Sequence, residues 1–212
     1  MARTGRGQTR LREIASPDNP LLKVFRRALA EGTTREGWLA VEGPRIVGEA
    51  LAAAGRAAVQ SVVVSRSGAE KFSQLLGRLP KEAEVARVSD RLFQRVAQTQ
   101  SPQGIAALVE LQPDDLDTII ARRDALLLIA CGLQDPGNLG TMLRSTQALG
   151  ASALITLEQT VSPFNPKAVR ASAGAIFRLP IFRDQKPGPL FGRLRAAGIR
   201  IIAADRRSPS RL

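Results

Sequence analysis

The sequence predicts an α/β protein made of two successive α/β domains, the second built on a parallel sheet. Strand-like runs alternate with helix-like segments of about 10–15 residues, which is typical of βαβ units. The pattern breaks once near the middle of the chain, at Pro113, Asp114 and Asp115, where an inter-domain linker fits. The 212 residues are 44% hydrophobic, which is enough for a core in each half.

The first predicted domain covers residues 25–112. Ser89 lies directly before one of its expected helices, where serine is a favoured N-cap. Strands joined by helices in this way favour a largely parallel sheet. The expected strands are Trp38–Glu42, Val59–Val64, Val85–Val88 and Ile105–Glu110, and the expected helices are Arg45–Ala54, Ala69–Leu79 and Asp90–Gln98.

A basic arm over residues 1–24 is expected to precede this domain. Its arginines fit contact with phosphate groups, and they fit a solvated terminus equally well. Within the arm, Pro20 favours a short amphipathic helix over Asn19–Arg27, because proline is tolerated in a first turn. The arginines in question are Arg3, Arg6, Arg10 and Arg12.

A linker over residues 113–124 and a second α/β run over residues 125–212 are expected to follow. Here the strand-like runs are continuously apolar, as they are when helices cover both faces of a parallel sheet. The expected strands are Ala125–Ala130, Ala153–Leu157, Arg178–Phe182 and Ile199–Ala204, and the expected helices are Leu139–Leu149, Pro166–Ile176 and Pro189–Ala197.

The charge of the chain indicates a polyanionic partner. Lys and Arg outnumber Asp and Glu by 31 to 19, which gives a net charge of +12. Such an excess most often marks binding to nucleic acid, although an arginine-rich proteome would produce it too. Aromatic residues make up only 4% of the chain, so phosphate contacts are expected to outweigh base stacking.

Several classes of protein are excluded by composition. The chain has no histidine and a single cysteine, Cys131, so a disulfide, a Cys/His zinc site and a Ser-His-Asp triad are ruled out. No metal site is predicted. No apolar run approaches the length of a membrane span, and the basic N-terminus lacks the apolar core of a secretion signal. A cytoplasmic protein without membrane contact is therefore the default expectation.

One segment, Cys131–Gly150, combines a buried strand, a glycine-containing turn and a helix. Ligands of open α/β sheets bind at the carboxyl ends of strands, so a site is expected here. Asn138 lies at the turn and Arg144 lies one helical turn after Gly140, and the two side chains could converge on one group. A plain turn with a solvent-exposed arginine explains the spacing equally well. The glycines do not form a GxGxxG or phosphate-loop pattern, which disfavours a generic nucleotide-binding protein.

The same segment resembles a motif of the SpoU-type RNA 2′-O-ribose methyltransferases, of the trefoil-knot (SPOUT) class. DPGNLGTMLRSTQALGA is similar to their Asn-x-Gly-x-x-x-Arg motif through Asn138, Gly140 and Arg144. Downstream, SPFNPKAVRASAGAIFRLP resembles a second family segment. Its matching residues are Pro163, Lys167, Arg170, Ser172 and Gly174.

The first domain resembles the ribosomal-protein-like substrate-binding domain that is often fused to these enzymes. FRRALAEGTTREGWLAVEGPRIVGEAL matches through Glu42, Gly43 and Arg45, and VSDRLFQRVAQTQSPQGIAALV matches through Gln103 and Gly104. The matching segments stand in the family's order and span about residues 25–205.

The resemblance implies that S-adenosylmethionine methylates a ribose 2′-hydroxyl of RNA, most plausibly ribosomal RNA. Arg144 would bind the hydroxyl or the phosphate and lower the hydroxyl's pKa, because a guanidinium stays protonated. Asn138 would hold Arg144 or the ribose. Lys167 and Arg170 would grip the RNA backbone, unless they form only a solvated basic helix face. The other implied RNA contacts are Arg45, Gln103 and Ser172, and Ser172 could serve helix packing instead.

The chain departs from the family pattern at its carboxyl end. The family's Gly-x-Glu-x-x-Gly and Ile-Pro…Ser-x-Asn stretches, which build most of the methyl-donor pocket and the dimer contact, do not occur before Leu212. The second domain is therefore expected to be incomplete, with Ala204 and Asp205 at the edge of the pocket. Poor donor binding is expected of this chain, and the complete protein is expected to form a homodimer. A non-catalytic RNA-binding protein remains the alternative.

Overall fold

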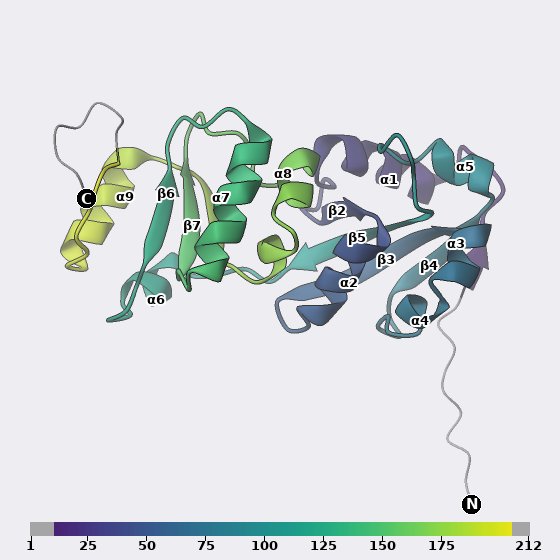
Figure 1. Cartoon of the computed structure of the whole chain (residues 1–212), viewed down its shortest axis with the longest axis horizontal. Coiled ribbons are helices and arrows are strands. Elements are labelled where there is room, and N and C mark those ends of the chain that lie inside the picture. The colour runs from purple at the N-terminus through teal and green to yellow at the C-terminus, as the bar shows by residue number, and fades with distance from the viewer. Residues whose placement is uncertain (1–10, 205–212) are drawn as a thin grey trace, which may run out of the picture.

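The computed structural model describes residues 11–204 as two sheets that lie end to end, each covered by helices (Figure 1). The front domain (residues 11–112) has a five-stranded sheet of order β1-β4-β3-β5-β2, and the rear domain (residues 116–204) has a three-stranded sheet of order β6-β7-β8. The two-domain α/β class predicted from the sequence is confirmed.

The front sheet is mixed. β4 pairs in parallel with β1 and β3, whereas β5 pairs antiparallel with β3 and β2. The prediction of a largely parallel sheet is therefore wrong for this domain, because local patterns reveal strands but not their partners. The strands are β1 (Leu11–Glu13), β2 (Leu39–Glu42), β3 (Ala57–Ser65), β4 (Glu84–Val88) and β5 (Ile105–Leu111).

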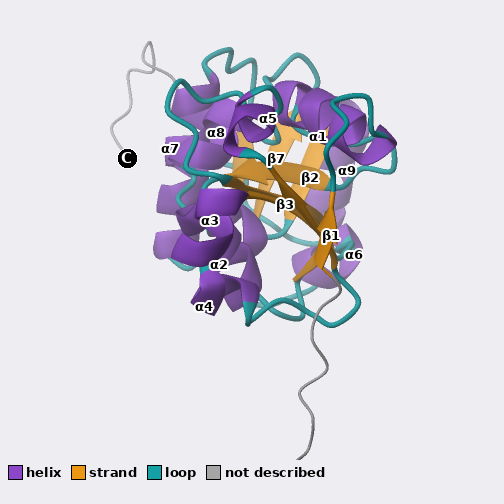
Figure 2. Ribbon diagram, turned by 90° about the vertical axis from the view of Figure 1, so that its right-hand side faces the viewer, coloured by secondary structure: helices purple, strands orange, loops and turns teal. Residues whose placement is uncertain are grey.

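Helices cover both faces of this sheet (Figure 2). Val62 and Val64 of β3 face a core built with α2, α3 and α4, while Val63 faces a core built with α1 and α5, as the alternation of side chains along a strand requires. The helices are α1 (Pro20–Glu31), α2 (Pro44–Ala52), α3 (Arg66–Lys71), α4 (Ser73–Leu76) and α5 (Asp90–Gln94).

Part of the expected N-terminal arm belongs to the front domain. β1 pairs with β4, and α1 begins at Pro20 and buries Leu22 and Phe25 completely. Burial of these apolar side chains against the sheet holds the segment in place. The predicted helix start is confirmed, and the side chain of Asn19 caps it by accepting the Leu21 N–H at 2.9 Å. Residues 1–10, with Arg3, Arg6 and Arg10, lie outside the described part of the chain.

Two other predicted helices differ in length. The helix expected over Ala69–Leu79 is two short helices, α3 and α4, which are interrupted at Phe72. The Ser89 cap is confirmed, since its hydroxyl accepts the Leu92 N–H at 3.2 Å, but α5 ends at Gln94.

The rear sheet is parallel, as predicted. Its strands are β6 (Leu127–Ala130), β7 (Ala153–Leu157) and β8 (Ile181–Gln185), and its helices are α6 (Leu116–Ile120), α7 (Pro136–Ala148), α8 (Pro166–Ala171), the 3₁₀ turn η1 (Ala175–Phe177) and α9 (Pro187–Ala196). The strand expected over Arg178–Phe182 begins only at Ile181, and the helix expected over Pro166–Ile176 is α8 followed by η1.

Two segments of the rear domain have a structure that their sequences did not indicate, and the strand predicted for the second of them is wrong. The expected linker contains α6, whose apolar face packs against α9. This segment is therefore part of the rear core. The buried residues that meet are Leu116 and Ile120 of α6 and Leu190 and Leu194 of α9. The expected strand Ile199–Ala204 has no regular structure and pairs with no strand of the described chain, because apolar sequence alone does not supply a strand with a hydrogen-bonding partner.

A continuous apolar core joins the two domains. Leu139, Leu143 and Phe177 of the rear domain belong to the same buried cluster as Val41 and Val47 of the front domain. Across the junction, Arg178 forms an ion pair with Glu49 of α2. Side chains from both domains therefore occupy fixed relative positions. No helix in residues 11–204 combines the length and apolar character needed to cross a membrane.

Candidate nucleic-acid interface and active site

The loops that follow β6 and β7 form one hydrogen-bonded platform at the carboxyl end of the rear sheet. Gly132 N–H donates to Thr160 Oγ1 at 3.1 Å, and Val161 N–H donates to the Leu133 carbonyl at 2.8 Å. The Gln134 amide adds a 2.7 Å bond to the Gln159 carbonyl. The two segments singled out in the sequence thus begin side by side, where open α/β sheets bind their ligands.

Asp135 positions the first turn of α7. Its side chain accepts the Asn138 N–H at 2.7 Å, and Pro136 occupies the first helical position. This arrangement of an acidic cap followed by proline is favourable for starting a helix. Asn138 is consequently helical, and the predicted start of this helix at Leu139 is three residues too late.

The same carboxylate joins α7 to α8. Asp135 Oδ2 accepts from Lys167 Nζ at 3.0 Å. The bond from the Asn138 N–H, and then the one from the Lys167 ammonium, hold the pKa of Asp135 below its ordinary value. The negative charge also lies at the positive end of the helix dipole. Lys167, predicted to grip RNA, is therefore already paired, although its side chain remains well exposed.

Gly140 allows α7 and α8 to pack closely. A Cβ atom at this position would contact the Ala168 carbonyl oxygen and would lie 2.6 Å from Ala171 Cβ. The neighbouring helix α8 therefore packs directly against Gly140. This close packing fixes the distance between the two helices. It therefore fixes the positions of Asn138 and Arg144 on α7 relative to Lys167 and Arg170 on α8.

Asn138 and Arg144 do not meet. Both side chains are exposed on α7. The two residues are six positions apart in the sequence, and six steps correspond to roughly 9 Å along the axis of an α-helix. No hydrogen bond joins them in the described chain, so the expectation that Asn138 holds Arg144 finds no support. Arg144 has no ion-pair partner within residues 11–204, which leaves its guanidinium available to a ligand.

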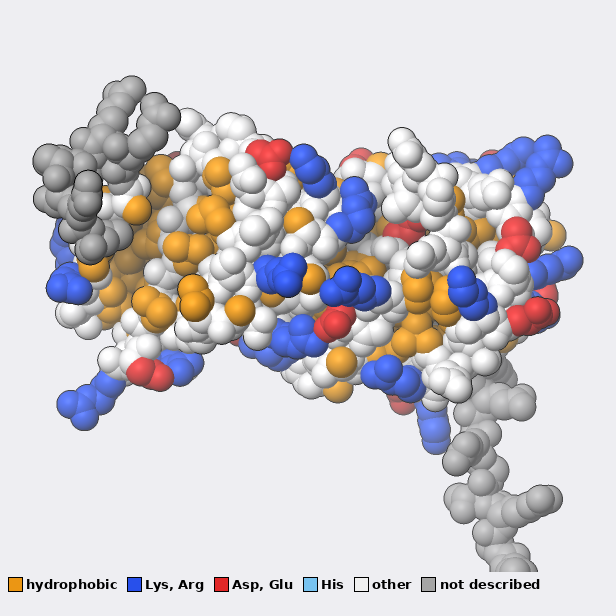
Figure 3. All heavy atoms as spheres, in the orientation of Figure 1, with side chains coloured by type: hydrophobic (Ala, Val, Ile, Leu, Met, Phe, Trp, Pro, Cys, Tyr) orange, Lys and Arg blue, Asp and Glu red, His pale blue; other side chains and the backbone are white. Residues whose placement is uncertain are grey.

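Three of the predicted RNA contacts lie together. Arg45 of α2, Gln103 before β5 and Arg170 of α8 line one cavity of about 180 Å³ between the domains, which we call the inter-domain groove. All three side chains are exposed. Lys and Arg side chains gather along the middle of this face, where α7 and α8 meet α2 (Figure 3).

Ser172 is placed differently. It is only 1% exposed, and its hydroxyl donates to the Val169 carbonyl at 2.7 Å. A buried hydroxyl whose donor is engaged within α8 cannot reach an RNA strand in this conformation. The prediction that Ser172 contacts RNA is therefore wrong for this conformation. The alternative that the sequence left open, a role in helix packing, agrees with the burial of Ser172.

Glu42 has a role that the sequence did not reveal. Its carboxylate accepts the Gln98 N–H at 2.8 Å and the Thr99 N–H at 3.3 Å, as well as the Thr99 hydroxyl. These bonds hold the loop that leads to Gln103. No local pattern signals such a contact, because Glu42 and Thr99 are far apart in the sequence. For Asp135, by contrast, the sequence does contain a signal, because an Asp-Pro pair is typical of the start of a helix.

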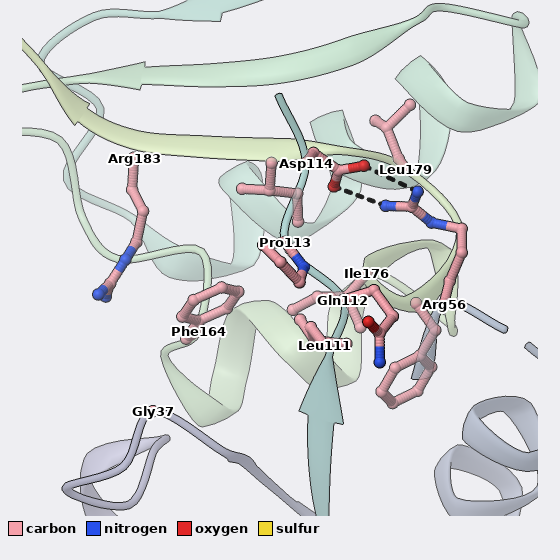
Figure 4. A pocket seen from close by; sticks show the side chains of 12 residues that line it. Gly37, Arg56, Leu111, Gln112, Pro113, Asp114, Phe164, Ile176, Leu179 and Arg183 are labelled. Carbon is pink, nitrogen blue, oxygen red and sulfur yellow. Dashed lines mark hydrogen bonds and ion pairs between the residues drawn. The ribbon is translucent and has the colours of Figure 1, made fainter. Parts of the chain in front are cut away.

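A second cavity, of about 220 Å³, surrounds the connection between the domains (Figure 4). Arg56 donates to the carboxylate of Asp114 through two nitrogens, at 2.9 and 2.7 Å, and this interaction raises the pKa of the guanidinium. Arg183 lies over the Phe164 ring, 5.0 Å from its centre. None of the predicted site residues lines this cavity.

The expected methyl-donor contacts are not supported by a built site. Ala204 is exposed, as are residues 201–203, and this segment has no regular structure. Asp205 lies outside the described residues. The described residues therefore do not enclose a donor molecule at that position. Within residues 11–204, no group of three or more Cys, Asp or Glu side chains is arranged to hold a metal ion.

A parallel sheet with a polar surface at its carboxyl end, and an inter-domain groove that carries two exposed arginines, fits the class of nucleic-acid-binding α/β proteins. Comparison with known families is more specific. Residues 125–211 match the SpoU rRNA Methylase family, and residues 27–107 match the MRM3-like substrate binding domain. The 23S rRNA (guanosine(2553)-2′-O)-methyltransferase RlmP of Bacillus subtilis is 30% identical over 196 residues, which are 90% of this chain and 72% of that protein. The chain belongs to the SpoU rRNA methylase family.

Other relatives agree with this assignment. A 23S rRNA (uridine(2479)-2′-O)-methyltransferase of Streptomyces viridochromogenes is 35% identical over 135 residues, which are 62% of this chain and 47% of that protein. An AdoMet-bound rRNA methyltransferase from Sinorhizobium meliloti superposes with a TM-score of 0.74 at 26% identity, covering 88% of this chain and 69% of that one. The chain thus spans between about half and about seven tenths of the length of these relatives.

Proposed function

We propose that the protein transfers a methyl group from S-adenosylmethionine to a ribose 2′-hydroxyl of ribosomal RNA. The observation that carries the proposal is the inter-domain groove, in which Arg45, Gln103 and Arg170 come together from both domains beside α7. The relatives support the substrate, since two of them are named as 23S rRNA 2′-O-methyltransferases. Solved structures titled as AdoMet-bound or AdoMet complexes support the methyl donor.

The chemical role is assigned to Arg144. A ribose hydroxyl is a weak nucleophile until its proton is lost, so a group that stabilises the developing oxyanion lowers the barrier. A guanidinium offers five N–H donors and no acceptor. We assign Arg144 to hydrogen bonding with the 2′-oxygen or the adjacent phosphate, and its exposure without an ion-pair partner in residues 11–204 is consistent with that role.

Four other residues are assigned to RNA binding. Asn138 offers an amide to the ribose from the first turn of α7, and Arg170 and Arg45 offer charge-assisted bonds to phosphates. Lys167 contributes charge while it is held by Asp135. In this arrangement both domains contact the RNA, and the second domain carries Arg144, which acts on the target ribose.

The proposal includes a homodimer and a cytoplasmic location. Leu149 is 80% exposed and Leu126 is 55% exposed, both at the end of the rear domain where α7 stops and β6 begins. Both side chains lie in the rear domain, through which the complete protein is proposed to pair with a second copy. Light scattering coupled to size-exclusion chromatography measures the mass of the protein in solution directly.

The cytoplasmic location follows from the proposed substrate, ribosomal RNA of a bacterial-type cell.

Methyl transfer tests the function. The product of the complete gene is incubated with 23S rRNA and donor carrying a tritiated methyl group, and label in the RNA is expected. Absence of label with active donor and intact RNA would contradict the proposal.

A second function, RNA binding without catalysis, is favoured by one observation, the exposure of Ala204 and its neighbours at the expected donor site. Calorimetric titration of the 212-residue chain with S-adenosylmethionine separates the two. Heat of binding with one-to-one stoichiometry supports the enzyme, and RNA binding without donor binding supports the alternative for this chain.

A further inference from the structure

A second groove lies on the front domain, and apart from Arg45 no residue singled out in the sequence lines it. It has a volume of about 640 Å³ and is formed by the start of α2 and by the α3–α4 region. We call it the α3–α4 groove. Its basic members are Arg45, Lys71 and Arg78, and its other polar members are Ser73 and Gln74. No carboxylate is among the side chains that line it.

The three cations of this groove are available to a ligand. Each side chain is exposed, and none forms an ion pair with a carboxylate in the part of the chain that the structure describes. Nine other cations of residues 11–204 do have such partners. Three unpaired cations around one hollow produce a local positive potential that attracts a polyanion.

An aromatic ring lies in the same groove. Phe72 is half-buried and packs against the front core, which fixes the ring, and Lys71 Nζ lies 5.4 Å from its centre. The contact holds the ammonium group over the ring face. A fixed ring beside cations suits a strand with phosphates and bases, whereas an acidic peptide would use only the charges.

The α3–α4 groove and the inter-domain groove are neighbours. Arg45 lines both. The carboxylates in the inter-domain groove are already engaged, because Glu42 binds the Gln98–Thr99 backbone and Glu49 pairs with Arg178. A phosphate chain could therefore pass from Arg170, over Arg45, to Lys71 and Arg78 without meeting a free carboxylate among these side chains.

We propose that the α3–α4 groove binds the sugar–phosphate backbone of the substrate RNA, as a continuation of the segment held between the domains. This inference rests on the proposed function and deepens it, since it assigns Lys71 and Arg78 to a second length of RNA far from the methylated ribose. Phosphate contacts of this kind fix the position of an RNA without reading its sequence.

The test compares two double variants that remove the same charge. Lys71→Gln/Arg78→Gln changes the groove. Lys23→Gln/Arg91→Gln changes α1 and α5, which cover the opposite face of the front sheet. All four side chains are exposed, so both variants are expected to fold, and circular dichroism checks this. Binding to a labelled 23S rRNA transcript is measured between about 50 and 200 mM salt, together with hydroxyl-radical footprints.

The groove variant is expected to bind roughly tenfold more weakly than the control variant, with a salt slope smaller by about 1.5, because each lost phosphate contact lowers the slope by about 0.7–0.9. One protected stretch of RNA should disappear from its footprint. Equal affinities and equal footprints for the two variants would overturn the inference. Competition by polyglutamate as effective as that by RNA would also overturn it, in favour of a general polyanion site.

These outcomes are separable from the proposed function. Methylation of 23S rRNA by wild-type protein, together with identical binding by the two double variants, rejects the groove alone. A wild-type protein that binds no RNA rejects both proposals.

Discussion

Asp135 and Lys167 form an ion pair of 3.0 Å that joins the first turn of α7 to the first turn of α8. The same carboxylate caps α7 by accepting the Asn138 N–H. One side chain thus caps the first of the two helices that carry the proposed RNA-binding and catalytic residues, and contacts the second.

Two substitutions separate these roles. Asparagine at position 135 keeps an acceptor for the cap but loses the ion pair, whereas alanine loses both. Asp135→Ala is therefore expected to lower the melting temperature by a few degrees, and Asp135→Asn by less. Calorimetric melting curves measure both. Equal losses for the two variants would show that the cap contributes nothing.

The ion pair and the cap predict a pH dependence. The pKa of Asp135 is lowered in the folded protein. The Asp135 carboxylate therefore stabilises the fold fully at pH values above the ordinary carboxyl pKa of about 4. This contribution is lost as the pH falls through the lower pKa of the folded state. The difference in melting temperature between wild type and Asp135→Asn is expected to be constant from pH 6 to 8 (the range above that titration) and to shrink in acid. A difference that grows on acidification has the wrong sign and would refute this assignment.

Gly140→Ala is expected to destabilise the protein by about 1–3 kcal/mol, because the added methyl group would be forced between α7 and α8. Gly192→Ala provides a matched control in α9, where nothing lies within 4 Å of the new Cβ. There the substitution is expected to stabilise by about 0.5–1 kcal/mol, since alanine is the better helix former. Urea unfolding measures both changes. A neutral Gly140→Ala would mean that the helices separate freely.

Arg144→Ala is expected to abolish methyl transfer while RNA affinity stays within about twofold, if the guanidinium acts at the chemical step. The exposed side chain lacks an ion pair in residues 11–204, so stability should change by less than about 0.5 kcal/mol. Arg195→Ala, on α9, is the control for loss of an exposed arginine that has no ion pair within residues 11–204. A parallel fall in RNA affinity and methylation for Arg144→Ala would assign this residue to binding alone.

Much of the architecture followed from local sequence patterns. The apolar runs at Ala153–Leu157 and Ile105–Glu110 are strands, and Ser89 and Pro20 mark helix starts. These features depend on neighbours in the chain. The antiparallel pairing of β2 with β5 was not predictable in this way, because strands distant in the sequence form it.

The site shows the same division. Arg45, Gln103 and Arg170 were singled out from separate segments by resemblance, and the fold brings them to one groove. Their roles in RNA binding remain predictions. Ser172 was chosen by the same resemblance, yet burial removes it from the surface. Lys71 and Arg78 belong to no motif in the sequence. The groove that they line is formed by α3, α4 and the start of α2, which come together only in the folded protein.

The position of the transferred methyl group tests the central claim most directly. 23S rRNA labelled by the product of the complete gene is digested with alkali, which cleaves next to free 2′-hydroxyls. A methylated 2′-oxygen cannot attack the adjacent phosphate, so the label is predicted to appear in alkali-resistant dinucleotides, and Arg144→Ala is predicted to leave none. Label recovered in single nucleotides would place the methyl group on a base and would contradict ribose methylation.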